Sequence, residues 1–283
     1  MTVDRIINVL VSVTLIEMMV AMGLSVTFTD LIGTCKNWRL VIRAALANYV
    51  CVPAATVALL LWFKPQPMVS IGFLILAVCP GAPYGPPFTA IAKGNVPIAV
   101  GLMAILAGSS AIIAPLLLHN LLLLLSEHEP LSLDLPKVAV TLLLTQLAPL
   151  CLGVAVRERW SKLASKLQGP ATLISKILNL IVVGLILITQ FHLLTDIRPL
   201  GFLGMLILLV TCWTAGWILG GPHADARKAM TLTTALRNVG VGLVIATGNF
   251  AGTPAVTAVL AYGIIEIAGS LLLAFCWKRS RSQ

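Results

Sequence analysis

Long apolar runs, separated by short polar turns, set the pattern of this chain. A helix that crosses a bilayer needs roughly 20 apolar residues in a row, and nine runs reach that length. We expect membrane helices at about residues 6–28, 40–63, 68–93, 96–125, 137–156, 174–193, 200–220, 226–249 and 254–277. The pattern therefore predicts an all-α membrane protein of nine transmembrane helices, folded as a single transmembrane domain over residues 1–283.

Two of these runs contain residues that interrupt a helix. The third holds "PGAPYGPP" at residues 80–87, and the eighth holds "TLTTALRNVGVG" at residues 231–242, which is polar and rich in glycine. Backbone groups freed by a break are costly in lipid, so breaks persist only where protein or a water-filled cavity satisfies them. The freed groups and helix dipoles then bind a solute or an ion. We therefore expect a binding site near the membrane centre, with a simple packing kink as the alternative.

The two interrupted runs also end in similar sequences. "IAKGN" at residues 91–95 closes the third run, and "IATGN" at residues 245–249 closes the eighth. With nine spans, these two helices run in opposite directions through the membrane. Related broken helices of opposite direction are typical of inverted-topology transporters, so we expect inverted repeats in this chain.

Composition and charge fit this picture. The chain is 59% apolar and only 10% charged, whereas soluble domains carry about 25% charged residues. Apart from Arg237 in the eighth span, the 19 basic residues divide into fourteen on one side and four on the other. The four are Arg5, Lys64, Lys137 and Arg198. The positive-inside rule then predicts a cytoplasmic C-terminus and an outer N-terminus, and the net charge of +9 faces lipid headgroups rather than nucleic acid.

Four short motifs carry a resemblance to a known family. They are "MVAMGLSVTFTDL" at 19–31, "NYVCVP" at 48–53, "CPGAPYGPPFTAIAKGN" at 79–95 and "TTALRNVGVGLVIATGN" at 233–249. The first resembles the Met-Gly-Leu-Ser motif of the bile acid:sodium symporter family, and the second its polar residue five positions before a helix proline. The last two resemble the two crossover helices of that family. The resemblance covers nearly the whole chain.

The resemblance implies an architecture of two parts. Members of the family have ten helices or nine, and this chain matches the shorter form. Three spans, at about 6–28, 137–156 and 174–193, are expected to form a panel. The expected core comprises the spans at about 40–63, 68–93, 96–125, 200–220, 226–249 and 254–277. The two discontinuous helices would cross in the core, and an elevator-like movement would expose the site to each side in turn.

The candidate site draws on both parts. The expected substrate-binding residues are Pro83, Tyr84, Gly85, Pro86 and Thr89 of the first crossover, Asn238 of the second, and Glu17 and Asn179 of the panel. The expected crossover and ion-site residues are Asn48, Thr233, Arg237 and Glu266. For Glu17 and Asn179 a second interpretation stays open, namely a structural hydrogen bond to a polar group nearby.

The sodium ligands that the resemblance implies are largely replaced. Positions expected to offer oxygen ligands hold Gly85, Pro86, Ala99 and Met103. The Glu-x-x-x-Gln-Asn pattern of the second crossover reads Thr233-x-x-x-Arg237-Asn238. Because sodium is a hard cation that takes oxygen ligands, we expect neither the usual sodium coupling nor a bound metal or cofactor.

Arg237 is the basic residue expected deep in the membrane. Inserting such a charge at a helix centre costs about 2.5–3.5 kcal/mol, so it faces the interior and finds a partner. If the eighth and ninth spans form a hairpin that turns at residues 250–253, then Arg237 and Glu266 lie at equal depth, and we predict an ion pair. Three roles stay open: Arg237 braces the crossover in place of sodium, contacts an anionic substrate, or belongs to a proton-sensitive pair with Glu266.

The predicted function is secondary transport of a small organic anion by alternating access, not coupled to sodium in the usual way of the family. The alternatives are a ligand-binding membrane receptor or regulator derived from a transporter, and a proton-coupled carrier. An enzyme is not expected, because the spans contain no HExxH motif, no GxSxG motif and no paired aspartates. We expect a multi-pass protein of the bacterial inner membrane. Its expected partners are the lipid bilayer and the small organic anion.

Overall fold

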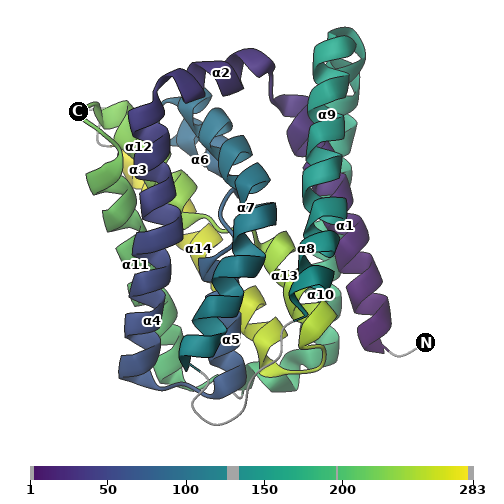
Figure 1. The fold of residues 1–283 in the computed structure, drawn as a ribbon, viewed down its shortest axis with the longest axis vertical. Helices are drawn as coiled ribbons and strands as arrows, with labels where there is room; N and C mark the ends of the chain where they lie inside the picture. Colours follow the sequence, from purple (N-terminus) through teal and green to yellow (C-terminus); the bar gives the residue numbers. More distant parts are fainter. Residues whose placement is uncertain (1–2, 126–133, 196, 280–283) are drawn as a thin grey trace.

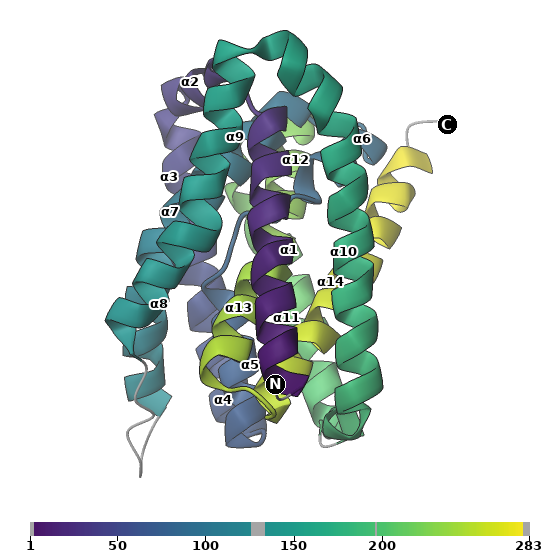
Figure 2. The ribbon, with the colours of Figure 1, turned by 90° about the vertical axis from the view of Figure 1, so that its right-hand side faces the viewer.

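The computed structural model describes residues 3–125, 134–195 and 197–279, and all regular secondary structure in these residues is helical. Most of the loop that follows the fourth predicted span, residues 126–134, lies outside them. Figures 1 and 2 show an elongated bundle whose two termini point toward opposite ends.

Seven of the described helices are long and apolar enough to cross a membrane. They span Val3–Ser25, Trp38–Phe63, Val96–Leu124, Leu135–Arg159, Ser161–Leu194, Pro199–Leu219 and Pro254–Arg279. These helices match every predicted run except the third and the eighth. One boundary differs clearly: the run predicted from residue 174 belongs to α10 (Ser161–Thr195), which starts earlier and contains Pro170. Its first turns carry Lys162 and Lys166 and therefore fall outside a purely apolar window.

The third and eighth predicted runs are each divided into two shorter helices. The third comprises α5 (Pro67–Ala77) and α6 (Gly85–Ile91). The eighth comprises α12 (Ala224–Ala235) and α13 (Val239–Asn249). Both breaks therefore fall on the Pro-, Gly- and Asn-containing segments that the sequence singles out, because proline lacks an N–H and glycine weakens a helix.

The two breaks meet each other. The backbone N–H of Asn238 donates to the carbonyl oxygen of Cys79 at 2.8 Å, and Pro80 and Arg237 form an isolated antiparallel bridge. On either side of this junction, α5 packs against α13 and α6 packs against α12. The interrupted segments therefore cross at their breaks and satisfy part of each other's freed backbone, which the bilayer would leave unpaired.

One group of helices packs around α1. Its members are α1 (Val3–Ser25), α8 (Leu135–Leu142), the π-helical segment η2 (Leu143–Leu147), α9 (Ala148–Arg159) and α10. Figure 2 shows α1 between α9 and α10. The backbones of α1 and α9 approach closely at Gly23 and Gly153, where a Cβ on Gly23 would lie 2.8 Å from the Cα of Gly153. Small residues permit this close packing in membranes.

The other helices surround the crossed breaks. They are α2 (Phe28–Lys36), α3 (Trp38–Leu46), the π-helical segment η1 (Ala47–Cys51), α4 (Val52–Phe63), α7 (Val96–Leu125), α11 (Pro199–Leu219) and α14 (Pro254–Arg279). Figure 1 shows α2 lying across one end of the molecule, between the α1 group and these helices.

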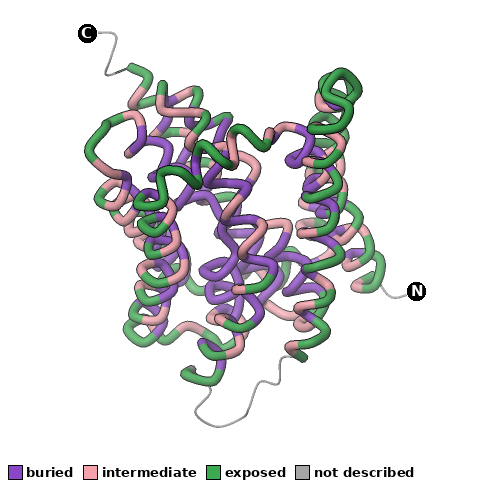
Figure 3. The backbone as a smooth tube through the Cα atoms, turned by 45° about the horizontal axis from the view of Figure 1, so that its top comes forward, coloured by how far each residue is buried: buried purple, intermediate pink, exposed green. Residues whose placement is uncertain are grey.

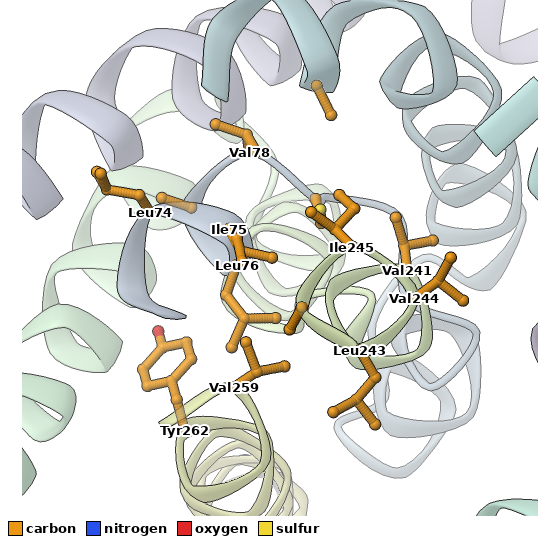
Figure 4. Packing of buried hydrophobic residues seen from close by; sticks show 14 of the residues in the cluster. Leu74, Ile75, Leu76, Val78, Val241, Leu243, Val244, Ile245, Val259 and Tyr262 are labelled. Atoms are coloured by element: carbon orange, nitrogen blue, oxygen red, sulfur yellow. The ribbon is translucent and has the colours of Figure 1, made fainter. Parts of the chain in front are cut away.

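Many of the fully buried side chains lie around the crossing. Figure 3 shows buried residues concentrated in the middle of the bundle and exposed residues on the outer helices. In Figure 4, Leu76 of α5, Ile245 of α13, and Val259 and Tyr262 of α14 gather in one cluster, and each is at most 1% exposed. Because lipid is as apolar as these side chains, dense packing rather than hydrophobic burial holds such a cluster together.

Candidate functional site

Arg237 lies at the centre of the crossing. Its side chain is 1% exposed, and its Nη1 donates to Oδ1 of Asn48 at 2.9 Å. Asn48 belongs to η1, and its Nδ2 donates to the carbonyl oxygen of Ala44 at 2.9 Å. π-Helical turns are frequent at functional sites. Here, η1 lies between α3 and α4 and carries Asn48, whose amide oxygen binds the Arg237 guanidinium. This hydrogen bond connects η1 to the break between α12 and α13.

Glu266 meets Arg237, but through other atoms than we predicted. Oε1 of Glu266, which is 0% exposed, accepts the backbone N–H of Arg237 at 2.9 Å. Nε and Nη2 of Arg237 and Oε2 of Glu266 have no hydrogen-bond partner among the described residues. The equal-depth argument is therefore right about the contact, while the predicted guanidinium–carboxylate pair is replaced by a backbone contact. The reason is the extended conformation of Leu236 (ψ 115°), which ends α12 and leaves the next N–H available to the carboxylate.

A small cavity of about 40 Å³ lies beside the break. Five predicted site residues line it, namely Pro83, Tyr84, Asn179, Arg237 and Asn238. Nδ2 of Asn179 donates to Oη of Tyr84 at 2.8 Å, so α10 contacts the first interrupted segment directly. A space of this size holds water molecules rather than an organic solute.

The other predicted substrate residues lie elsewhere. Gly85, Pro86 and Thr89 are buried at the start of α6, where the Thr89 hydroxyl donates to the carbonyl oxygen of Gly85 at 2.8 Å. None of these three lines the small cavity. Thr233 directs its hydroxyl to the carbonyl oxygen of Ala229 at 2.8 Å, within its own helix.

Glu17 is engaged by a neighbouring helix. Its Oε2 accepts a hydrogen bond from the hydroxyl of Ser175 in α10. Of the two interpretations left open for Glu17, the structure therefore favours a hydrogen bond to a nearby polar group. No sequence pattern indicated Ser175 as the partner, because its position beside Glu17 depends on how α1 and α10 pack.

A larger cavity, of about 380 Å³, was not predicted. It lies between the first turns of α1, the start of α8 and the end of α13, and eight of its fourteen lining residues have polar or charged side chains. The lining residues are Asp4, Arg5, Asn8, Ser12, Lys137, Val138, Thr141, Leu142, Val244, Ile245, Thr247, Gly248, Asn249 and Ala251. Nδ2 of Asn8 donates to Oγ1 of Thr247 at 3.2 Å across it. The sequence pattern that could have indicated this cavity is the pair Asn8 and Ser12, two polar residues four apart on one face of an apolar helix.

At the end of the bundle opposite to the larger cavity, hydrogen bonds connect the two interrupted segments a second time. The backbone N–H and Nδ2 of Asn95 both donate to Asp225, each at 3.1 Å, and Nζ of Lys228 donates to the carbonyl oxygen of Ala92 at 2.8 Å. Asp225 precedes the predicted eighth span. The hydrogen bond from Asn95 lowers the pKa of Asp225 below its usual value, so this carboxylate is charged at neutral pH.

Two interrupted helices that join backbone to backbone are a feature of multi-pass membrane proteins that build solute sites from discontinuous helices. In this chain they meet at a buried guanidinium. A sequence model of the Sodium Bile acid symporter family matches residues 12–213. The chain belongs to this family.

Three relatives illustrate the relationship. The chain is 24% identical over 277 residues to the uncharacterized sodium-dependent transporter YocS of Bacillus subtilis (strain 168), covering 94% of this chain and 82% of that protein. It is 24% identical over 274 residues to the probable sodium/metabolite cotransporter BASS1, chloroplastic, of Arabidopsis thaliana, covering 93% and 65%. It is 22% identical over 278 residues to the sodium-dependent organic anion transporter of Bos taurus, covering 92% and 70%.

Proposed function

We propose that this protein is a secondary transporter that carries a small organic anion across a membrane by alternating access. Membership of the family and the transporter names of the relatives support secondary transport. The observation that carries the proposal is the crossing of the two interrupted helices, with the cavity of about 380 Å³ beside α13. That volume lies within the range of about 300–1,000 Å³ typical of ligand pockets.

The proposed architecture has nine membrane crossings with inverted repeats. The α1 group forms the panel, and the helices around the crossing form the core. The larger cavity is lined by α1 and α8 of the proposed panel and by α13 of the proposed core. A cavity at this boundary changes its access when the two parts move relative to each other, which is the requirement of alternating access.

The proposed orientation has the N-terminus outside and the C-terminus in the cytoplasm of a bacterium. The distribution of the 19 basic residues supports this orientation, and the match to a bacterial relative over 94% of this chain supports a bacterial membrane. In this orientation the larger cavity lies at the outer end of the bundle.

The charges of the larger cavity favour an anion. Arg5 and Lys137 are exposed basic residues in its lining, whereas Asp4 is the acid. Oδ1 of Asp4 already accepts a hydrogen bond from Nε2 of Gln190 at 3.2 Å. The Arg5 guanidinium and the Lys137 ammonium group are therefore available to bind a carboxylate or a sulfonate.

Replacing both basic residues, Arg5→Gln with Lys137→Gln, is expected to raise the KM for anion uptake by about fivefold to tenfold, because each exposed charge contributes up to about 1 kcal/mol. The KM is obtained from the initial rates of uptake of labelled taurocholate and of labelled succinate into proteoliposomes, using whichever of the two anions the unaltered protein carries. Lys64→Gln, at the same end but outside this cavity, is the matched control. Equal effects of the control and the double variant would contradict an anion site here.

Transport is proposed to be independent of sodium, although the relatives carry names that include sodium. The Asn48 amide oxygen accepts from Arg237 Nη1, so it is occupied by a cation that belongs to the chain. Gly85 and Pro86 offer no side-chain oxygen, and the Thr233 hydroxyl bonds within its own helix. These contacts favour Arg237 as a fixed brace in place of a sodium ion.

The test is anion flux into proteoliposomes with sodium, proton and potential gradients imposed one at a time. Replacing external sodium by potassium, with the potential clamped, is expected to leave the initial rate unchanged. A sodium-dependent rate would contradict this part of the proposal. Ligand binding without flux would favour a receptor instead.

A proton-coupled carrier is the second candidate. The buried Glu266 favours it, because its Oε2 has no hydrogen-bond partner in the part of the chain that the structure describes. In that case an imposed proton gradient would drive uptake, and Glu266→Gln would remove the dependence on the gradient.

A further inference from the structure

Two arginines converge on one turn at the end of the molecule that holds most of the basic residues. Nε of Arg227 donates to the carbonyl oxygen of Gly221 at 2.7 Å. Nη1 of Arg43 lies 3.4 Å from the position that a Cβ on Gly221 would occupy. The two guanidinium groups therefore lie against the same residue of the turn between α11 and α12.

No acid of the described chain forms an ion pair with either arginine. Asp225 is two residues from Arg227, but its Oδ2 accepts from Asn95. Two like charges beside one turn repel each other, so an anion that contacts both groups is attracted to this turn. A phosphate meets this need best, because guanidinium groups bind phosphate oxygens in a bidentate fork.

Tryptophan rings indicate that this anion lies at the membrane surface. The guanidinium of Arg227 lies 5.6 Å from the ring centroid of Trp217, and the rings of Trp217 and Trp277 are 5.5 Å apart. Tryptophan is enriched at the level of the lipid headgroups. The ends of α3 and α12 and the C-terminus lie at the same end of the molecule in Figures 1 and 2.

We propose that Arg43 and Arg227 bind the headgroup phosphate of an anionic phospholipid, with Trp217 and Trp277 beside its glycerol and upper acyl region. A zwitterionic headgroup is disfavoured, because its own ammonium group competes for the phosphate. The bound lipid joins α3 to the turn between α11 and α12. The proposal does not depend on the transport function.

The test is native mass spectrometry of the full-length protein in detergent, titrated with phosphatidylglycerol or with phosphatidylcholine. Phosphatidylglycerol is expected to bind more tightly. Arg43→Gln is expected to weaken its binding by about fivefold, the factor for one basic residue near an anionic surface. Arg43 is exposed, so the variant is expected to fold normally, as size-exclusion chromatography would verify.

Arg39→Gln is the matched control, because it removes the same charge from the same helix. Arg39 lies over Trp38, at 5.6 Å, and away from Gly221, so phosphatidylglycerol binding is expected to stay at the level of the unaltered protein. Equal losses in both variants, or none in Arg43→Gln, would overturn the proposal. Displacement of the lipid by inorganic phosphate at millimolar concentration would also overturn it, in favour of a site for free phosphate.

Discussion

Replacing Arg237 with methionine is expected to lower the apparent melting temperature of the purified protein by on the order of 10 °C. The change leaves the Asn48 amide oxygen without its donor and the fully buried Glu266 without a nearby positive charge. Leaving a buried charge without compensation typically costs about 3–5 kcal/mol, and each kcal/mol corresponds to about 2–4 °C in a large domain. A fluorescence-based unfolding scan in detergent measures this shift.

A double variant separates the charge effect from a simple loss of packing. Glu266→Gln keeps an oxygen for the backbone N–H of Arg237 and removes the negative charge. The combination of Arg237→Met with Glu266→Gln is therefore expected to be less destabilised than the sum of the two single changes. Arg198→Met, an exposed residue at the outer end, is the control and is expected to change little. Strict additivity of the two single changes would contradict an electrostatic coupling between Arg237 and Glu266.

Gly81→Ala is expected to be at least as damaging, because Gly81 is the point at which the first break touches α7. Its φ is +89°, and a Cβ at this position would lie 2.4 Å from the backbone nitrogen of Ala107. The left-handed backbone alone costs about 1–2 kcal/mol for a residue with a side chain, and overpacking adds about 1–3 kcal/mol. We expect the variant to lose about 3 kcal/mol or more and to yield little monodisperse protein in size-exclusion chromatography.

Gly33→Ala provides the matched comparison. A Cβ on Gly33, in the exposed helix α2, meets no atom within 4 Å. Alanine is favoured over glycine within a helix by roughly 0.5–1 kcal/mol, so this variant is expected to be as stable as the unaltered protein or slightly more so. Similar behaviour of the two variants would contradict the close approach of Gly81 to α7.

Much of the fold could be predicted from the sequence because the relevant signals are local. The length of an apolar run is set by the thickness of the bilayer, and seven of the predicted spans coincide with helices long and apolar enough to cross it. Proline and glycine at residues 80–87 interrupt a helix wherever it packs. Even the contact between Arg237 and Glu266 followed from the fixed rise per residue of two adjacent helices.

The tertiary structure decided what depends on rotation and on distant helices. The rise per residue gives the depth of a residue in the membrane but not the direction in which its side chain points. Only packing therefore determined that the Arg237 guanidinium reaches Asn48 while Glu266 accepts the backbone N–H of Arg237. The larger cavity needs α1, α8 and α13 side by side, and Arg43 and Arg227 both reach Gly221 only because α3 lies beside the turn that precedes α12. Such contacts join residues far apart in the chain, whose relative orientation is set by the shapes of all the side chains between them.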